Sequence, residues 1–232
     1  MLLNPVQNRL IELLPARDRA RLLAACEPVN LVLSQVLEDA GSPTRHVYFP
    51  TEGFISLVSR VDEHPGLEVG MVGREGMVGA ALVLGVAVAP LHALVQGAGA
   101  SWRISAAAFR RELKGSTALQ RQLSLYLYVL MAQTVSSAGC LRFHLVGQRL
   151  ARWLLMSQDR AHQAQFHVTH EFLAYMLGVR RVGVTVAAGD LQRRGLIHYH
   201  RGELTVHDRA GLEAAACSCY AADRRVYSKH LG

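Results

Sequence analysis

The chain has 232 residues, of which 50% are hydrophobic, and it carries a formal net charge of +7 at pH 7. This length suits one large domain or two modest ones, each able to bury a core. Four cysteines are too few and too scattered for a disulfide framework, which excludes a small disulfide-stapled fold. They are Cys26, Cys140, Cys217 and Cys219.

The basic charge is concentrated in the last part of the chain. Residues 1–144 hold 13 Lys and Arg against 11 Asp and Glu, a net of +2, whereas residues 145–232 hold 12 against 7, a net of +5. Nearly all of this excess is arginine, whose planar guanidinium makes bidentate contacts with phosphates and guanine edges. The charge therefore favours an anionic partner for residues 145–232.

Two apolar stretches bear on targeting. The N-terminal "MLLNPVQNRLIELLPARDRARLL" interleaves charges with apolar residues and does not resemble a signal peptide, which favours a reduced, cytoplasmic setting. Residues 76–102 carry no Asp, Glu, Lys or Arg and are long enough to cross a bilayer. They contain Pro90, His92, Gln96 and several glycines, with no basic cluster at either end. We therefore expect buried short elements here, and no membrane span.

The N-terminal part is expected to contain a helix, from about Asn8 to Cys26, followed by strands. The runs "LVLSQVLEDAG", "HVYFPTEGFISLVSRV", "LEVGMVG" and "ALVQGAGASWRIS" are separated by turn residues at spacings suited to an antiparallel sandwich or barrel. The segment "GREGMVG" at 73–79 is neither a dinucleotide-binding fingerprint nor a P-loop, and no G-x-S-x-G or H-E-x-x-H is present. Nothing in this part argues for an enzyme.

A long helix is expected over about 106–141. Four apolar residues recur at spacings of four, three and four, as in the seam between two paired helices. They are Leu119, Leu123, Tyr126 and Leu130. The alternative is a helix that packs on its own sheet. The position of the helix between two domains favours the pairing of two subunits.

The C-terminal part begins with a helix near Leu145. Its inward face is expected to carry Val146, Leu150, Trp153 and Leu154, with Gln148, Arg149 and Arg152 off that face. The segment "DRAHQAQFH" ends this helix. A second helix then starts with Thr169 as N-cap and ends at Gly178, a residue that tolerates positive φ.

The next helix, about Arg181 to Arg193, has two distinct faces. Its buried face is expected to carry Val184, Ala187, Ala188 and Leu191, and its outward face Arg181, Val182, Thr185 and Val186. Exposed valines suit solvent poorly and have weak helix propensity, but they contact thymine methyls well, and an arginine beside them suits guanine. This pattern predicts a DNA-reading helix. The alternative is that the outward face packs against the N-terminal domain.

A small hairpin with a turn at Arg201–Gly202 follows. Ile197, Tyr199, Leu204 and Val206 fall on one face, and His198, His200, Glu203, Thr205 and His207 on the other. This pattern predicts the wing of a winged helix-turn-helix. The histidines would alternatively bind metal with Glu203 or His207, but the spacing defines no complete ligand set. No metal is therefore assigned.

In this order of elements, the chain resembles the Crp/Fnr superfamily of bacterial transcription regulators. The resemblance is strongest in "VGQRLARWLL", "VTHEFLAYMLGVRRVGVTVAAGDLQRRGLI" and "HVYFPTEGFISLVSRV...LEVGMVGREGMVG". It implies an α+β fold: an antiparallel, jelly-roll-like β-roll with a dimerisation helix over 1–144, and a winged helix-turn-helix over 145–232. It also implies a homodimer on a two-fold symmetric site in double-stranded DNA, a sensory N-terminal domain with a small-molecule effector, and contact with RNA polymerase.

The departures from the family pattern concern the effector. Members that bind cyclic nucleotides carry Gly-Glu-x-x-Gly and a later Arg-Ser-Ala. Here Arg74 follows Gly73, and Leu91 and His92 stand where Arg-Ser would fall, so the phosphate loses its cationic partner. We expect no cyclic AMP binding, although a different effector would use the pocket formed by Gly73, Arg74, Glu75 and Gly76. The N-terminal cysteine cluster of the oxygen-sensing iron–sulfur members is also missing, so no cofactor is expected.

The expected DNA-binding residues divide by role. Thr169, His170 and Arg180 are expected at phosphates, and His200 and Arg201 at the DNA backbone near the wing. The base edges are expected to meet Arg181, Val182, Thr185 and Val186. Val182 and Val186 stand where the family often has a Glu and a second Arg, which implies a different operator. The principal rival is a signalling module whose winged helix binds protein, and an enzyme is the weakest alternative.

Overall fold

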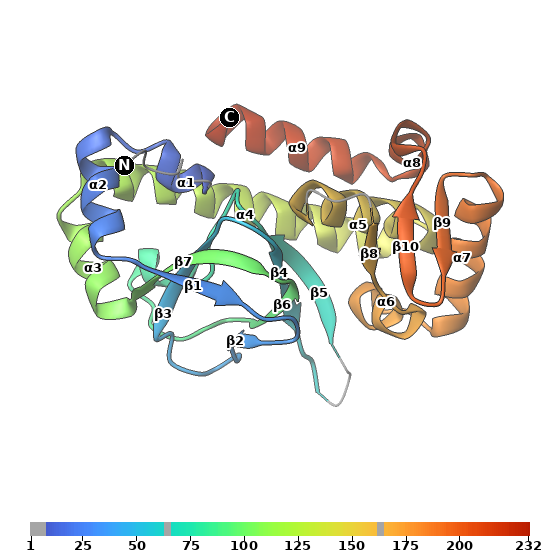
Figure 1. Ribbon diagram of the computed structural model, residues 1–232, viewed down its shortest axis with the longest axis horizontal. Helices are drawn as coiled ribbons and strands as arrows, with labels where there is room; N and C mark the ends of the chain where they lie inside the picture. The colour runs from blue at the N-terminus through green and yellow to red at the C-terminus, as the bar shows by residue number, and fades with distance from the viewer. Residues whose placement is uncertain (1–7, 63–65, 162–164) are drawn as a thin grey trace. The chain divides into compact units, whose positions relative to one another are not determined.

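A computed structural model describes residues 8–62, 66–161 and 165–232 (Figure 1). The chain divides into two compact units. One comprises Met1–Leu57, Met71–Met131 and Tyr227–Gly232, and the other Val58–Gly70 and Ala132–Val226. The helix α4 (Thr117–Phe143) contributes residues to both units.

The first unit is built around two β-sheets. Their strand orders are β1-β7-β3 and β2-β6-β4-β5, and the pairs β1–β7, β3–β7 and β2–β6 are antiparallel. The strands are β1 (Glu27–Leu31), β2 (Val36–Glu38), β3 (His46–Pro50), β4 (Phe54–Ser59), β5 (Leu67–Val72), β6 (His92–Gly97) and β7 (Gly99–Ser105). The other elements are α1 (Arg9–Glu12), α2 (Ala16–Ala24), the 3-10 helix η1 (Ala80–Leu84), α3 (Ala106–Lys114) and α4. The predicted α+β class with an N-terminal β-roll is confirmed.

The core of this unit explains the alternating sequence runs. Side chains from both sheets form one buried cluster, because successive residues of a strand point to opposite faces and the apolar ones face inward. The cluster consists of Leu31, Tyr48, Ile55, Val72, Val78, Ala93 and Val95. Phe49 and Phe109, both fully buried, pack with ring centroids 6.5 Å apart and fasten α3 to β3.

Two predicted helices are each divided in the structure. The helix expected from Asn8 to Cys26 is α1 and α2, because Pro15 lacks the N–H that a continuous helix requires and disfavours helical geometry at the residue before it. The helix expected over 106–141 is α3 and α4. The break lies at Gly115 and Ser116, where the Ser116 hydroxyl accepts a hydrogen bond from the Leu119 N–H at 3.0 Å and caps the new helix.

The uncharged stretch 76–102 forms no helix long enough to cross a membrane. It contains η1, β6 and the first part of β7, as expected for buried short elements. In the described part of the chain, α4 is the single helix whose length and composition would allow a membrane span, and 22% of its most apolar window is buried. Helices α6 (His170–Leu177) and α7 (Arg181–Arg193) pass the same test only as one bent pair.

The second unit contains a three-stranded sheet and five further helices among its described residues. The strands β8 (Gln165–His167), β9 (Ile197–His200) and β10 (Glu203–Val206) lie in the order β8-β10-β9. The helices are α5 (Val146–Ala161), α6, α7, α8 (Arg209–Ala215) and α9 (Ser218–Leu231). Strand β8 was not predicted, because only three residues pair with β10 and such a short strand has no readable period. The predicted break after α5 falls partly on residues 162–164, outside the described residues.

The prediction for α5 was right for three of the four residues of its apolar face, with Val146 only partly buried, and wrong for its arginines. Leu150, Trp153 and Leu154 are buried as expected. Arg149 and Arg152, expected off that face, are each only 9% exposed. Arg152 forms an ion pair with Asp223 of α9 at 2.7 Å, and Arg149 donates to the carbonyl of Leu177. Helix α9 was not predicted from the sequence, and it supplies the carboxylate that permits burial of a charge.

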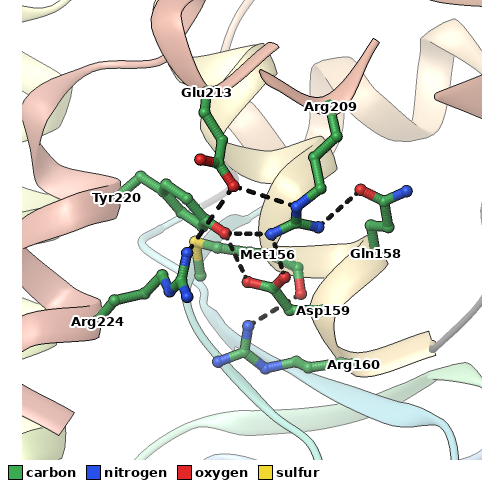
Figure 2. Close-up of polar contacts among 8 residues, drawn as sticks. All are labelled: Met156, Gln158, Asp159, Arg160, Arg209, Glu213, Tyr220 and Arg224. Atoms are coloured by element: carbon green, nitrogen blue, oxygen red, sulfur yellow. Dashed lines mark hydrogen bonds and ion pairs between the residues drawn. The ribbon is translucent and has the colours of Figure 1, made fainter. Parts of the chain in front are cut away.

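A polar network holds α8 and α9 onto α5 (Figure 2). Arg209 of α8 donates to Asp159 Oδ1 at 2.6 Å and to Gln158 Oε1 at 2.8 Å, both on α5. It also donates to the hydroxyl of Tyr220 on α9 at 2.7 Å, and that hydroxyl donates to Asp159 Oδ2 at 2.8 Å. Several charge-assisted hydrogen bonds on one guanidinium fix its orientation. The C-terminal helices are therefore anchored to the second unit at a defined point.

Candidate nucleic-acid interface

Helices α6 and α7 form a helix-turn-helix. Their axes differ in direction by 109°, and Gly178 makes the turn with φ at +60°. The Thr169 hydroxyl caps α6 by accepting from the Phe172 N–H at 3.1 Å. In α6 the buried residues are Leu173, Ala174, Met176 and Leu177. The buried residues of α7 are those that the sequence predicts, Val184, Ala187, Ala188 and Leu191.

The opposite face of α7 is exposed in the structure. Val182 is 74% exposed and Val186 66%. Arg181 and Thr185 are exposed on the same face. Burying apolar surface is favourable and exposing it is not, so a helix that keeps two valines in solvent lacks a partner on that side. The bounds of α7 and both of its faces are as the sequence predicted.

His170 occupies a position between α6, α7 and the wing. Its ring stacks on Tyr199 of β9 with centroids 4.5 Å apart, and its Nδ1 lies 3.0 Å from the Thr185 hydroxyl oxygen. The Thr185 hydroxyl donates its hydrogen to the carbonyl of Arg181 at 3.1 Å. With that proton committed, the oxygen is left as an acceptor for His170, and from this network we assign the imidazole proton to Nδ1. Burial, with the nearby positive charge of Arg181, lowers the pKa of His170 and favours this neutral form.

These contacts alter the expectation for His170. A neutral ring whose Nδ1–H is already engaged has only the acceptor Nε2 left, and an acceptor does not bind phosphate. Nε2 is itself buried without a partner among the described residues. At neutral pH His170 thus positions α7 relative to the wing. Tyr199, which stacks on His170, was not among the predicted site residues. The one sequence signal for it was its predicted place on the inward face of the hairpin.

The wing has the predicted register and turn. β9 pairs with β10 so that His200 faces Glu203 and Ile197 faces Val206. Arg201 and Gly202 adopt φ of +51° and +89°, the left-handed geometry of a two-residue hairpin turn. A Cβ on Gly202 would lie 2.6 Å from the exposed His167 ring, so the ring would have to shift, and the positive φ is what favours glycine there. His200 and Arg201 are exposed at the tip.

The wing histidines do not assemble a metal site. Glu203, the first proposed co-ligand, is engaged with His167 at 2.8 Å. The rings of His198 and His207 are 6.0 Å apart. Within the described ranges, no group of three close ligand atoms includes a residue of this hairpin.

The arginines around the helix-turn-helix differ in their ion pairing. Arg193 and Arg194, at the end of α7, lie 3.1 and 3.6 Å from the carboxylate of Asp190, which offsets their charge. Arg180, Arg181 and Arg201 are exposed and have no acidic partner among the residues that the structure describes. Their positive charge is therefore available to an anion. Arg180 and Arg181 lie at the N-terminus of α7, and Arg201 lies at the tip of the wing.

The loop predicted to bind an effector, residues 73–76, makes contacts with other residues of its own unit. The Asn8 side chain donates to the Gly76 carbonyl at 2.9 Å, and the Arg9 N–H donates to the Arg74 carbonyl at 2.7 Å. A Cβ on Gly76 would overlap the Tyr126 hydroxyl, so Tyr126 packs directly on the loop. Elsewhere in this unit, the buried His92, which stands in place of the family's phosphate-binding residues, is 2.7 Å from the Asp39 carboxylate.

The prediction that Leu119, Leu123, Tyr126 and Leu130 of α4 form a dimer seam is wrong for the first three, while Leu130 is partly buried. Leu119, Leu123 and Tyr126 are at most 3% exposed within the single chain, and the Tyr126 hydroxyl is hydrogen-bonded to the backbone of Met77 at 3.1 Å. This is the alternative in which the helix packs on its own domain. Five of the exposed residues of α4 follow a second repeat, with spacings of four, three, four and three. They are Ser124, Tyr128, Met131, Val135 and Ala138.

Comparison with known proteins agrees with this geometry. Residues 148–215 match the family described as the Crp-like helix-turn-helix domain. The fold is similar to that of the c-di-GMP responsive global regulator CLP from Xanthomonas campestris, at 18% identity and a TM-score of 0.68, covering 83% of this chain and 99% of that one. A CRP/FNR-family transcriptional regulator from Thermus thermophilus is 21% identical with a TM-score of 0.66, covering 82% and 98%. FixK2 from Bradyrhizobium japonicum is 13% identical with a TM-score of 0.64, covering 83% and 98%. No curated protein sequence matches the chain.

Proposed function

The chain carries a Crp-like helix-turn-helix on a Crp/Fnr-type fold, and we propose that it is a cytoplasmic, homodimeric transcription regulator that reads double-stranded DNA. The observation that carries the proposal is the outward face of α7, where two exposed valines lie beside Arg181. In the major groove, methyl groups of this kind can contact thymine and a guanidinium can read guanine.

The cationic residues have separate roles in this proposal. Arg181, the first residue of α7, reads a base, because the N-terminal end of a recognition helix enters the major groove most deeply. Arg180 precedes the helix and binds phosphate, together with the capped N-terminus of α6 at Thr169. Arg201 and His200 at the tip of the wing reach the adjacent DNA backbone.

The second repeat of α4 supports the homodimer. Tyr128, Met131 and Val135 are 48%, 58% and 68% exposed and lie on one stripe of the helix. Apolar residues at alternating spacings of three and four form the seam of a two-helix coiled coil. Two copies of α4 joined along this stripe would pair two recognition helices, which suits a DNA site with two half-sites about one helical turn apart.

The sensory domain is proposed not to bind cyclic AMP or cyclic GMP. A bound phosphate requires a cation, and the position that would supply it holds Leu91 and His92. His92 is in contact with the carboxylate of Asp39, which would repel a phosphate nearby. The proposal also includes a small-molecule effector of other chemistry and contact with RNA polymerase. Both of these rest only on the resemblance to the Crp/Fnr family.

Selection of bound fragments from random duplex DNA tests this function. The purified protein should enrich one sequence with two related half-sites. Binding to it should weaken steeply with salt, because several phosphate contacts release counterions. Arg225, an exposed arginine of α9, provides a matched control, since Arg225→Ala removes one positive charge outside the proposed interface. Failure to enrich any sequence would instead support the rival, a winged helix that binds protein.

A further inference from the structure

Four potential metal ligands converge in the second unit, outside the helix-turn-helix. Cys140 and His144 lie one turn apart at the end of α4, Cys217 directly precedes α9, and Cys219 lies in its first turn. The ligand atoms of all four lie within 4.8 Å of one another. Cys140 Sγ is 3.4 Å from Cys217 Sγ, and Cys219 Sγ is 3.6 Å from His144 Nδ1.

We propose that Cys140, His144, Cys217 and Cys219 bind one divalent zinc ion in tetrahedral geometry. Zinc–sulfur bonds of about 2.3 Å and zinc–nitrogen bonds of about 2.0–2.1 Å place neighbouring ligand atoms of a tetrahedron roughly 3.5–3.8 Å apart. The two contacts of 3.4 and 3.6 Å are close to these edges, and the remaining separations, which are within 4.8 Å, need to contract by about 1.3 Å at most. Three cysteines and one histidine form one of the ligand sets used by structural zinc sites.

The surroundings suit a site with net negative charge. Three thiolates and one Zn²⁺ leave a charge of about −1, and two buried cations of α5, Arg149 and Arg152, interact electrostatically with Cys140 and Cys217, with the Asp223 carboxylate paired to Arg152. Zinc is bound by thiolates, so binding would release the three thiol protons, and the affinity should fall as the pH is lowered.

Two other occupants fit the geometry less well. A Cys140–Cys217 disulfide would need its sulfurs to approach from 3.4 Å to about 2.05 Å, and it would leave Cys219 and His144 beside it without a role. An iron–sulfur cluster places several irons and sulfides between its cysteine ligands, and these ligands lie too close together for that. A mononuclear ion accounts for all four side chains at once.

The site would join segments that are distant in sequence. Cys140 and Cys217 are 77 residues apart, and the metal would fasten the end of α4 to the junction of α8 and α9. The Arg209 network anchors α8 and α9 to α5 (Figure 2), and the Arg152–Asp223 ion pair anchors α9 to α5. Since these contacts already preorganise the ligands, zinc binding should stabilise the folded protein by mass action.

The experiment is metal binding by the reduced full-length protein after chelator treatment. Titration with Co²⁺, a spectroscopic probe for tetrahedral sites, should give one ion per chain with the intense absorption of thiolate coordination, and Zn²⁺ should displace it. Thermal unfolding should shift to higher temperature with Zn²⁺. Cys26→Ser is the matched control, because Cys26 lies outside the cluster and burial raises its pKa to about 12.

Variants in the half-buried ligands keep the test interpretable. Cys219→Ser and His144→Gln should each lower zinc affinity by at least about tenfold and abolish most of the thermal shift, whereas Cys26→Ser should change neither. Circular dichroism would verify that both ligand variants remain folded. Absence of stoichiometric Co²⁺ binding, a weak octahedral spectrum, or Co²⁺ binding lost only in Cys26→Ser would each overturn the proposal. DNA binding is measured separately, so failure of the metal site leaves the proposed function intact.

Discussion

Replacing Arg181 with alanine should weaken binding to the preferred DNA site and relax selectivity at one base pair in each half-site. Arg181 is exposed and has no ion pair among the described residues, so its removal breaks no charged contact within the protein. The hydrogen bond from the Thr185 hydroxyl goes to the backbone carbonyl of residue 181, which alanine retains. The loss is therefore expected in the DNA complex and not in the folding of α7.

The size of the effect follows from the contact that is removed. A bidentate arginine–guanine pair contributes roughly 1–3 kcal/mol of discrimination, or about 5- to 150-fold in affinity for each half-site. A dimer on a two-fold site loses this contact twice. Arg180→Ala should behave differently: it should weaken all sequences about equally and make the salt dependence shallower by roughly two units per dimer, one for each phosphate contact.

Fluorescence anisotropy on the selected operator and its single-base variants, at several salt concentrations, separates these two effects. The control Arg225→Ala should leave both the sequence preference and the salt dependence close to those of the parent protein. If Arg181→Ala instead weakens every sequence equally, α7 does not read bases through this residue. The assignment would then fail even if the protein still binds DNA.

Four further predictions concern other parts of the molecule. Met131→Glu with Val135→Glu should produce monomers with weak operator binding, and a double variant that still sediments as a dimer would exclude this seam. His170 should titrate below its ordinary 6.5 by NMR, since burial and Arg181 lower its pKa. Below about pH 6.5 the unfolded chain then binds more protons than the folded one, so the free energy of unfolding falls as the pH drops from 6.5 towards the lower pKa of the folded state. His170→Gln should lessen that loss of stability. A pKa at or above 6.5 in the folded protein contradicts the argument. Arg209→Ala should lower the free energy of unfolding by about 1–3 kcal/mol in urea denaturation, and an unchanged midpoint would mean that its network contributes no net stability. Calorimetry should detect no micromolar complex with cyclic AMP or cyclic GMP, and a one-per-subunit complex would reverse the effector assignment.

The sequence by itself determined the features that depend on neighbours along the chain. The bounds and both faces of α7 follow from the helical period of about 3.6 residues, and the wing follows from alternation around Arg201 and Gly202. These elements are set by local hydrogen bonding and by which side chains avoid water. Both effects are readable within a short stretch of chain, so the order of residues alone is enough to locate the helix-turn-helix.

Only the tertiary structure decided which apolar face packs against which partner. Helix α4 has two apolar stripes with similar spacing, and the one that contains Leu123 is buried because Tyr126 and its neighbours contact the β-roll around Met77. The burial of Arg152 likewise depends on Asp223, a residue from a helix that the local pattern did not disclose. The cysteines looked scattered because proximity in sequence says nothing about residues 77 positions apart, and folding brings Cys140 to Cys217. Periodicity shows that a face exists, but long-range packing selects its partner.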